Sequence, residues 1–269
     1  MNRTLSSTLL LSTILLLSAC SSLGSNSKTS ITTDIQKLKF SSPSAQQRVI
    51  IYNHGISRPQ LVEPCFLSYN QPPRSLNALR DNNTLVYRLC STSTEAPVIT
   101  SAGKQVYLRK VEINYAIDSF LARGIKPKHL FLAGHSNGGW TSLMMMRDVN
   151  KRFNGVIAYA PEFAGRRDET IIVPWWRKLV RPRQIKDMLS APTMDALIFA
   201  YENDAYNRPQ DLQFLTNKYP LNNNSGVDLV SYSCGLQNAH LTYRSDCRLT
   251  DTTRRIRTFV RKQIETWEK

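Results

Sequence analysis

Short apolar runs alternate along the chain with segments of helical character. The runs that predict strands cover residues 48–54, 84–90, 129–133, 155–160, 195–201 and 227–233. Helices are predicted over residues 104–123, 138–150, 209–218 and 251–267. Apolar strands that alternate with helices predict a mostly parallel central sheet with helices on both faces. Active sites of such sheets lie at the carboxyl ends of the strands, so the residues that follow each strand are the candidates for chemistry.

The longest predicted helix shows how its faces are assigned from the sequence. Leu108, Val111 and Tyr115 are spaced i, i+3 and i+7, which predicts that they share one face toward the core. Gly124 ends the pattern and Pro127 follows it, as is usual after a helix.

The N-terminus has the pattern of an export signal. Arg3 gives a positive start, residues 9–17 are mostly apolar, and small residues lead to Cys20. The stretch Leu17-Ser18-Ala19-Cys20 resembles the lipobox of bacterial lipoproteins. That resemblance implies a signal peptide over residues 1–19 and a lipidated Cys20. Residues 21–30 are rich in Ser, Asn and Gly, so residues 20–30 are predicted to be the lipidated cysteine and a flexible tether. Ser21 after the cysteine implies a lipid anchor in the outer membrane, facing the periplasm of the bacterial cell envelope.

The charge balance favours anionic surfaces as partners. The full chain carries a net charge of +15, and removal of residues 1–19, which hold Arg3 and no acid, leaves 34 − 20 = +14. For an envelope protein those surfaces are lipid head groups or anionic polymers. The sequence contains no nucleic-acid-binding signature, so we expect no nucleic acid partner.

Four cysteines remain if Cys20 carries lipid, and an even number in an exported chain predicts disulfides. Three pairings are possible. We favour the two that close local loops, Cys65–Cys90 and Cys234–Cys247. Unpaired buried thiols are the alternative.

The strongest chemical signal is Gly134-His135-Ser136-Asn137-Gly138-Gly139, which fits G-x-S-x-G between an apolar strand and a helix. A tight strand-to-helix turn holds the serine in a strained conformation, and side chains two positions away on either side would collide. The hydroxyl then stands clear at the sheet edge, beside a helix N-terminus that favours developing negative charge. Ser136 is therefore the candidate nucleophile.

This segment resembles the nucleophile elbow of the α/β-hydrolase superfamily, in particular its small dienelactone hydrolase-like and esterase-like members. The resemblance extends over residues 46–268 by the order of elements, and it implies one α/β-hydrolase domain over residues 31–269. In that superfamily the acid and then the histidine follow the serine along the chain. His240 is the one histidine after the elbow, and histidine suits proton shuttling near neutral pH.

Three carboxylates are candidates for the acid that orients His240. Asp204 lies at the turn offset that resembles the superfamily pattern, with Tyr201 in the place of glycine, and is favoured. Glu202 lies two residues nearer the strand. Glu162 follows the preceding strand, where some lipases carry their acid.

The oxyanion hole is predicted from two backbone amides. His54-Gly55 ends the first strand and resembles the H-G turn of the superfamily, so the N–H of Ile56 is one donor. The N–H of Asn137, directly after the nucleophile, is the other. His54 itself is interpreted as structural.

Residues 163–190 lie where the superfamily inserts a cap. They contain Trp175-Trp176 and a set of basic residues: Arg166, Arg167, Arg177, Lys178, Arg181, Arg183 and Lys186. The segment is either an amphipathic lid that touches membrane or a solvated helix with its aromatics packed inward. At the N-terminal end, residues 31–40 leave room for one strand before residue 48.

Together these patterns predict a serine hydrolase that cleaves carboxylic esters of small molecules or lipids, with no metal or organic cofactor. A peptidase, amidase or thioesterase would use the same triad, so the sequence does not separate them. A non-catalytic envelope-binding lipoprotein on the same scaffold is the alternative from another class.

Overall fold

The computed structural model describes residues 28–40, 42–55, 70–91, 102–148, 150–167, 173–236 and 239–267. The predicted signal peptide and Cys20 lie outside these residues, so lipidation and the envelope location stay predictions. No helix within the described ranges combines the length and apolarity that a membrane span requires.

Six parallel strands form one sheet in the order β2-β1-β3-β4-β5-β6. They are β1 (Arg48–Asn53), β2 (Thr84–Leu89), β3 (Leu130–His135), β4 (Gly155–Tyr159), β5 (Ala196–Tyr201) and β6 (Val227–Tyr232). Each strand coincides with a predicted run to within a residue or two, because β-branched and aromatic runs bounded by glycine, proline or polar turns leave few alternatives. The prediction of a mostly parallel sheet is confirmed.

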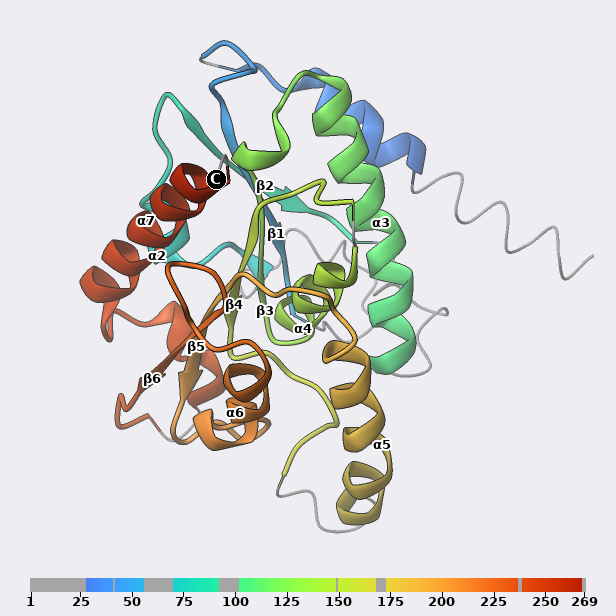
Figure 1. The fold of residues 1–269 in the computed structure, drawn as a ribbon, viewed down its shortest axis with the longest axis vertical. Helices are drawn as coiled ribbons and strands as arrows, with labels where there is room; N and C mark the ends of the chain where they lie inside the picture. Colours follow the sequence, from blue (N-terminus) through green and yellow to red (C-terminus); the bar gives the residue numbers. More distant parts are fainter. Residues whose placement is uncertain are drawn as a thin grey trace, which may run out of the picture.

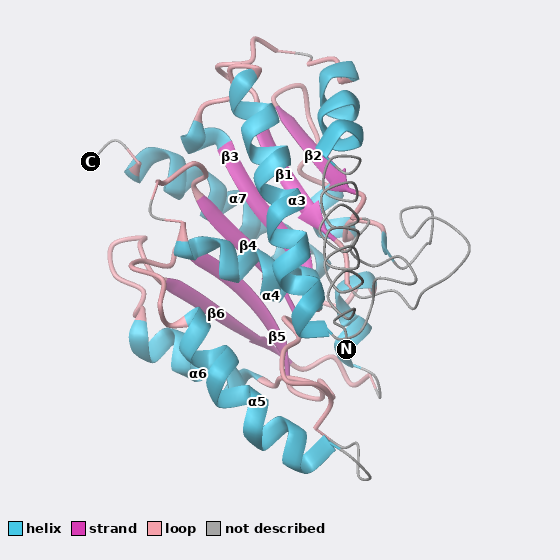
Figure 2. Ribbon diagram, turned by 90° about the vertical axis from the view of Figure 1, so that its right-hand side faces the viewer, coloured by secondary structure: helices cyan, strands magenta, loops and turns pink. Residues whose placement is uncertain are grey.

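Helices cover both faces of the sheet, as Figures 1 and 2 show. They are α2 (Arg74–Asn77), α3 (Ala102–Ala122), α4 (Asn137–Met144), α5 (Val173–Met188), α6 (Pro209–Lys218) and α7 (Leu249–Thr266). Short 3₁₀ segments lie at η4 (Pro127–His129), η5 (Met145–Arg147) and η6 (Ala239–Arg244). The predicted helix over 138–150 is shorter than expected, since its last turn is the tighter η5.

Alternate residues of each strand enter two separate cores. Val49 and Ile51 of β1 pack with α3, α4, α5 and α6 on one face. Ile50 and Tyr52 pack with α2, α7 and η6 on the other. This period of two is what a sheet buried on both sides requires. Met188 at the end of α5 is fully buried in the first core, so this end of the expected cap segment serves as a sheet-covering helix.

One expectation near the N-terminus is wrong. Residues 28–37 are helical, so residues 31–40 supply no strand before β1, and this helix includes residues 28–30. Ile31 and Ile35 explain the difference, because their i, i+4 spacing places both side chains in the first core.

The predicted core face of α3 is also wrong. Val111 is 45% exposed, whereas Val106, Ile113 and Ile117 are fully buried. Arg109 occupies the middle of the buried face. A charged residue in that position interrupts the apolar pattern, so the sequence favours the weaker stripe through Leu108.

The chain order reverses at β1, because β2 lies on one side of it and β3 on the other. In open parallel sheets a crevice forms at the carboxyl ends of the strands at such a reversal. Gly55 follows β1 and Ser136 follows β3, so both lie at this point.

Candidate functional site

The turn between β3 and α4 holds Ser136 in a strained backbone conformation. Its φ is 57° and its ψ is −126°, in a region that side-chain-bearing residues rarely adopt. A Cβ on Gly134 would lie 2.4 Å from the carbonyl of Gly138, and a Cβ on Gly138 would lie 2.2 Å from the carbonyl oxygen of Asn53. The prediction that glycine is needed two residues before and after the serine is therefore confirmed.

Three side chains that are distant in sequence meet at the carboxyl edge of the sheet. His240 Nε2 lies 2.9 Å from Ser136 Oγ, and His240 Nδ1 lies 2.9 Å from Asp204 Oδ2. All three residues are buried. Because the carboxylate accepts the Nδ1 hydrogen, Nε2 keeps its lone pair and can accept the serine hydroxyl hydrogen. The structure thus brings together the serine, histidine and first-choice acid of the sequence analysis.

The three candidate acids occupy different places. Asp204 uses its second oxygen, Oδ1, to accept the N–H groups of Tyr206 and Asn207 at 2.7 and 3.3 Å. Glu202 is exposed. Glu162 Oε2 lies 2.7 Å from Ser136 Oγ and accepts its hydroxyl hydrogen, so this carboxylate faces the serine. The hydroxyl has a single hydrogen, which goes to Glu162 or to His240 at any one time.

A covalent bond closes the loop that carries His240. Cys234 and Cys247 form a disulfide with their Cα atoms 6.1 Å apart, which confirms the favoured pairing. Cys90 is a disulfide cysteine as well, and its expected partner Cys65 lies outside the described residues.

His135, the last residue of β3, contacts the same loop. Its Nε2 lies 3.0 Å from the carbonyl oxygen of His240, and its ring stacks on Tyr243 with centroids 3.8 Å apart. Burial, and next the neighbouring His240, lower the pKa of His135 well below its usual value. The ring is therefore neutral at physiological pH, with a hydrogen on Nε2 to donate to that carbonyl.

The expected oxyanion hole is described in part. Asn137 is buried at the first position of α4, and Ile56 lies outside the described residues. A Cβ on Gly55 would lie 3.2 Å from Ser136 Cβ, so the turn after β1 passes close to Ser136. Burial and the nearby Arg109 lower the pKa of His54 to about 3, which keeps this ring neutral as its structural interpretation requires.

Arg109 supports the turn after β1, and sequence reasoning missed it. Its guanidinium is buried and donates from Nη1 to the carbonyl oxygen of His54 at 2.6 Å. Its Nε also lies 3.4 Å from Ser91 Oγ after β2. A lone arginine inside the apolar pattern of a helix is the signal that could have identified it.

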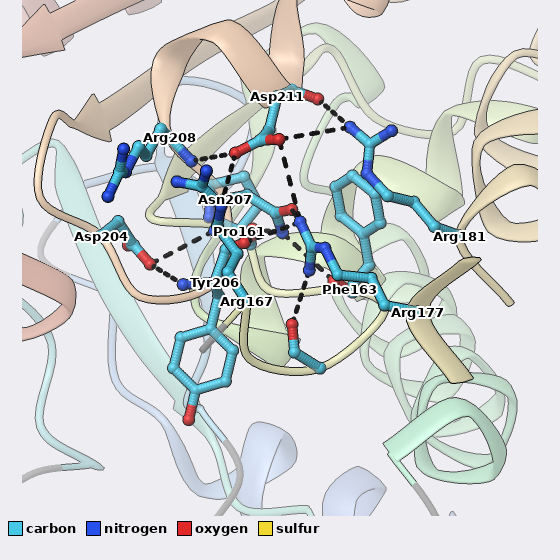
Figure 3. Close-up of polar contacts among 11 residues, drawn as sticks. Pro161, Phe163, Arg167, Arg177, Arg181, Asp204, Tyr206, Asn207, Arg208 and Asp211 are labelled. Atoms are coloured by element: carbon cyan, nitrogen blue, oxygen red, sulfur yellow. Dashed lines mark hydrogen bonds and ion pairs between the residues drawn. The ribbon is translucent and has the colours of Figure 1, made fainter. Parts of the chain in front are cut away.

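Arg177 of α5 connects the loops that carry Glu162 and Asp204 (Figure 3). It donates to the carbonyl oxygens of Gly165 at 2.6 Å and Tyr206 at 2.9 Å, and to Asn207 Oδ1 at 2.9 Å. In the sequence it was one basic residue of a possible cap, and no local pattern distinguishes it from its neighbours.

Asn207 completes this connection (Figure 3). Its Nδ2 donates to the carbonyl oxygens of Pro161 at 3.0 Å and Phe163 at 3.3 Å, on either side of Glu162. The loop after β4 and the loop after β5 are therefore held as one unit by α5.

If Asp204 orients His240 for catalysis, as the sequence predicts, Arg177→Met is expected to lower kcat about 10- to 100-fold with little change in KM, because small displacements of an orienting group are costly. Arg181→Met is the matched control. Arg181 is one turn further along α5, lies 3.9 Å from the same Asp211 carboxylate as Arg177, and donates to the backbone carbonyl oxygen of Asp211 at 2.6 Å. Steady-state kinetics and thermal melting of both variants are the measurements. Equal kcat values in the two variants would contradict a role in positioning Asp204.

Ser136 and His240 line a cavity of about 490 Å³, and Asp204 is buried behind His240. The described residues that line it are Gly55, Asn70, His135, Ser136, Glu162, Tyr206, His240, Leu241, Tyr243 and Arg244. Within the described part of the chain, no group of three or more histidine, cysteine, aspartate or glutamate side chains could hold a metal ion.

No protein-family profile matches the chain, and no curated protein matches it. Solved structures do match, with low identity. The apo form of esterase 2 from Thermogutta terrifontis has a TM-score of 0.56 at 12% identity, over 82% of this chain and 85% of that chain. TT1662 from Thermus thermophilus has a TM-score of 0.56 at 15% identity, over 83% and 92%. Est1E from Butyrivibrio proteoclasticus, with ferulic acid bound, has a TM-score of 0.54 at 15% identity, over 85% and 94%.

At these identities the similarity concerns the fold alone. With the six-stranded parallel sheet and its helical layers, it shows that this chain has the α/β-hydrolase fold, as the sequence predicted.

Proposed function

We propose that the protein is a serine hydrolase that cleaves carboxylic esters through an acyl-enzyme intermediate. The observation that carries the proposal is the continuous hydrogen-bonded line from Asp204 through His240 to Ser136, with both links 2.9 Å long. Esterases among the structural neighbours support the ester as the substrate bond.

In the proposed reaction Ser136 Oγ attacks the ester carbonyl while His240 Nε2 takes the hydroxyl hydrogen. Asp204 holds the Nδ1–H tautomer and stabilises the imidazolium that forms. The imidazolium then protonates the leaving alcohol. Water attacks the acyl-enzyme in the second half of the reaction, with His240 as the base again.

The oxyanion is proposed to bind between the N–H groups of Asn137 and Ile56. Asn137 is at the N-terminus of α4, where the helix dipole favours the negative charge that develops in the tetrahedral state. The close passage of the turn at Gly55 beside Ser136 supports a donor from the residue that follows.

A fluorophosphonate probe tests this proposal because it reacts with activated serines. We expect labelling of the wild type, loss of labelling in Ser136→Ala, and unchanged labelling in Ser190→Ala, which removes an exposed serine at the end of α5. A folded wild-type protein that stays unlabelled would remove the hydrolase proposal and favour a non-catalytic binding protein.

Ester, thioester and amide substrates share the same triad, so kinetics must separate them. A series of p-nitrophenyl esters of graded chain length, with matched thioesters and anilides, is the direct comparison. A steep preference for long acyl chains would favour a lipid ester, and activity on short chains alone would favour a small-molecule ester.

A further inference from the structure

A second carboxylate contacts the nucleophile, and the proposed reaction does not use it. Glu162 lies after β4, and its Oε2 is 2.7 Å from Ser136 Oγ. Its own N–H donates to the carbonyl oxygen of Ser136 at 3.0 Å, so backbone and side chain both contact the same residue.

The backbone around Glu162 is fixed. Asn207 binds the carbonyl oxygens on both sides of it, at Pro161 and Phe163. Ala160 and Ala164 have positive φ values of 42° and 64°, which alanine adopts only where the surroundings hold it. The carboxylate is therefore presented to the cavity by a built loop.

Glu162 is not placed to orient the base, because Asp204 already binds Nδ1 of His240. When Ser136 donates its hydrogen to His240, Glu162 Oε2 loses that bond. A fixed carboxylate beside the reacting carbon also opposes anionic substrates and the negative charge of the tetrahedral state. A cationic hydrogen-bond donor on the substrate would offset both effects.

Bond lengths place such a donor on the α-carbon of the acyl group. An α-nitrogen is two bonds from the carbonyl carbon, or about 2.5 Å from it, for bonds of about 1.5 Å. When that carbon is bonded to Ser136 Oγ, an α-nitrogen can lie within hydrogen-bond distance of a carboxylate oxygen that is itself 2.7 Å from Oγ.

We propose that Glu162 binds the α-ammonium group of the substrate, so that the preferred substrates are esters of α-amino acids. This inference rests on the proposed function and narrows its substrate class. Of the described residues that line the cavity, Glu162 is the carboxylate beside the nucleophile. Arg244 also lines the cavity, and its side chain is exposed to solvent.

The test compares three ethyl esters whose α-substituents have similar size: L-alanine with an ammonium, L-lactate with a hydroxyl, and isobutyrate with a methyl. It is run at about pH 7, where most α-amino groups, with a pKa of about 7.7 to 8.0, carry their proton. Each kcat/KM is divided by the hydroxide-catalysed rate constant of the same ester, which removes differences in intrinsic reactivity.

In the wild type we expect the corrected kcat/KM of the alanine ester to exceed that of the isobutyrate ester about 10- to 100-fold, the worth of a hydrogen bond to a charged group. Glu162→Gln should reduce this ratio at least about tenfold. Glu202→Gln, which removes an exposed carboxylate next to the same sheet edge, should leave the ratio unchanged.

A wild-type ratio near one, a lactate ester that exceeds the alanine ester, or a ratio that persists in Glu162→Gln would overturn the inference. A wild type that reacts with the fluorophosphonate but hydrolyses none of the three esters would overturn this inference alone, and one that also stays unlabelled would overturn the proposed function. Labelling rates of the wild type with an α-aminoalkyl phosphonate and its alkyl analogue give the same comparison without any variant.

Discussion

Asp204→Asn is expected to lower kcat for ester hydrolysis about 10⁴-fold while the protein stays folded. The reason lies in the second oxygen of Asp204. Oδ1 accepts the N–H groups of Tyr206 and Asn207, so the carbonyl oxygen of an asparagine would take that place. Its NH₂ group would then face His240 Nδ1 and stabilise the tautomer that carries its hydrogen on Nε2. In that tautomer the ring cannot accept the hydrogen of Ser136.

Two further substitutions make this result specific. Glu202→Gln removes an exposed acid two residues away and should leave kcat close to that of the wild type. Glu162→Gln reports on the acid that faces the nucleophile. Steady-state kinetics with a single p-nitrophenyl ester and thermal melting of all three variants are the measurements. A small loss in Asp204→Asn beside a loss of several orders of magnitude in Glu162→Gln would assign the orienting role to Glu162.

Gly138→Ala is expected to destabilise the fold by more than about 3 kcal/mol and to abolish activity, since the added Cβ has no space. It would lie 2.2 Å from the carbonyl oxygen of Asn53 and 2.4 Å from that of His54. Both neighbours are backbone atoms at the end of β1, so relief requires the strand and the turn beside the nucleophile to move. Helix propensity acts in the opposite direction, because alanine is favoured over glycine inside a helix by about 1 kcal/mol.

Gly139→Ala is the matched control, one residue further along α4. Its Cβ would lie 3.1 Å from the carbonyl oxygen of Gly134, which a small shift can relieve. Chemical denaturation should therefore show a much smaller change in the free energy of unfolding than in Gly138→Ala. Similar losses in both variants would mean that the helix start, and not contact with β1, sets the glycine requirement.

The sheet and the meeting of Ser136, Asp204 and His240 followed from local patterns. Each strand is a continuous apolar run, and parallel strands bring their carboxyl ends to one edge, so residues that follow strands are brought together. The glycines two residues before and after Ser136 also predict the tight turn that the structure shows. These features depend on residue type and spacing within short segments, and a single sequence is enough to show both.

The supporting contacts could not be predicted in this way. Arg177 reaches loops about 12 and 30 residues away, and its neighbours in sequence are equally basic. The buried Arg109 donates to the carbonyl oxygen of His54. These two groups meet only when α3 packs beside β1, so the sequence alone does not show the contact. The sequence offers Glu162 as an acid for His240, because its position after β4 is visible in the sequence and the direction of its side chain is not.

The bond between Cys234 and Cys247 spans 13 residues and encloses His240. The sheet can assemble from apolar burial alone, whereas this cross-link requires the removal of two electrons from two thiols. In a newly made chain the turn at Ser136 can therefore form before this cross-link closes the loop that carries His240. Maturation of the proposed enzyme then includes an oxidation step, and a reductant that opens this bond would remove one of the contacts that hold the loop.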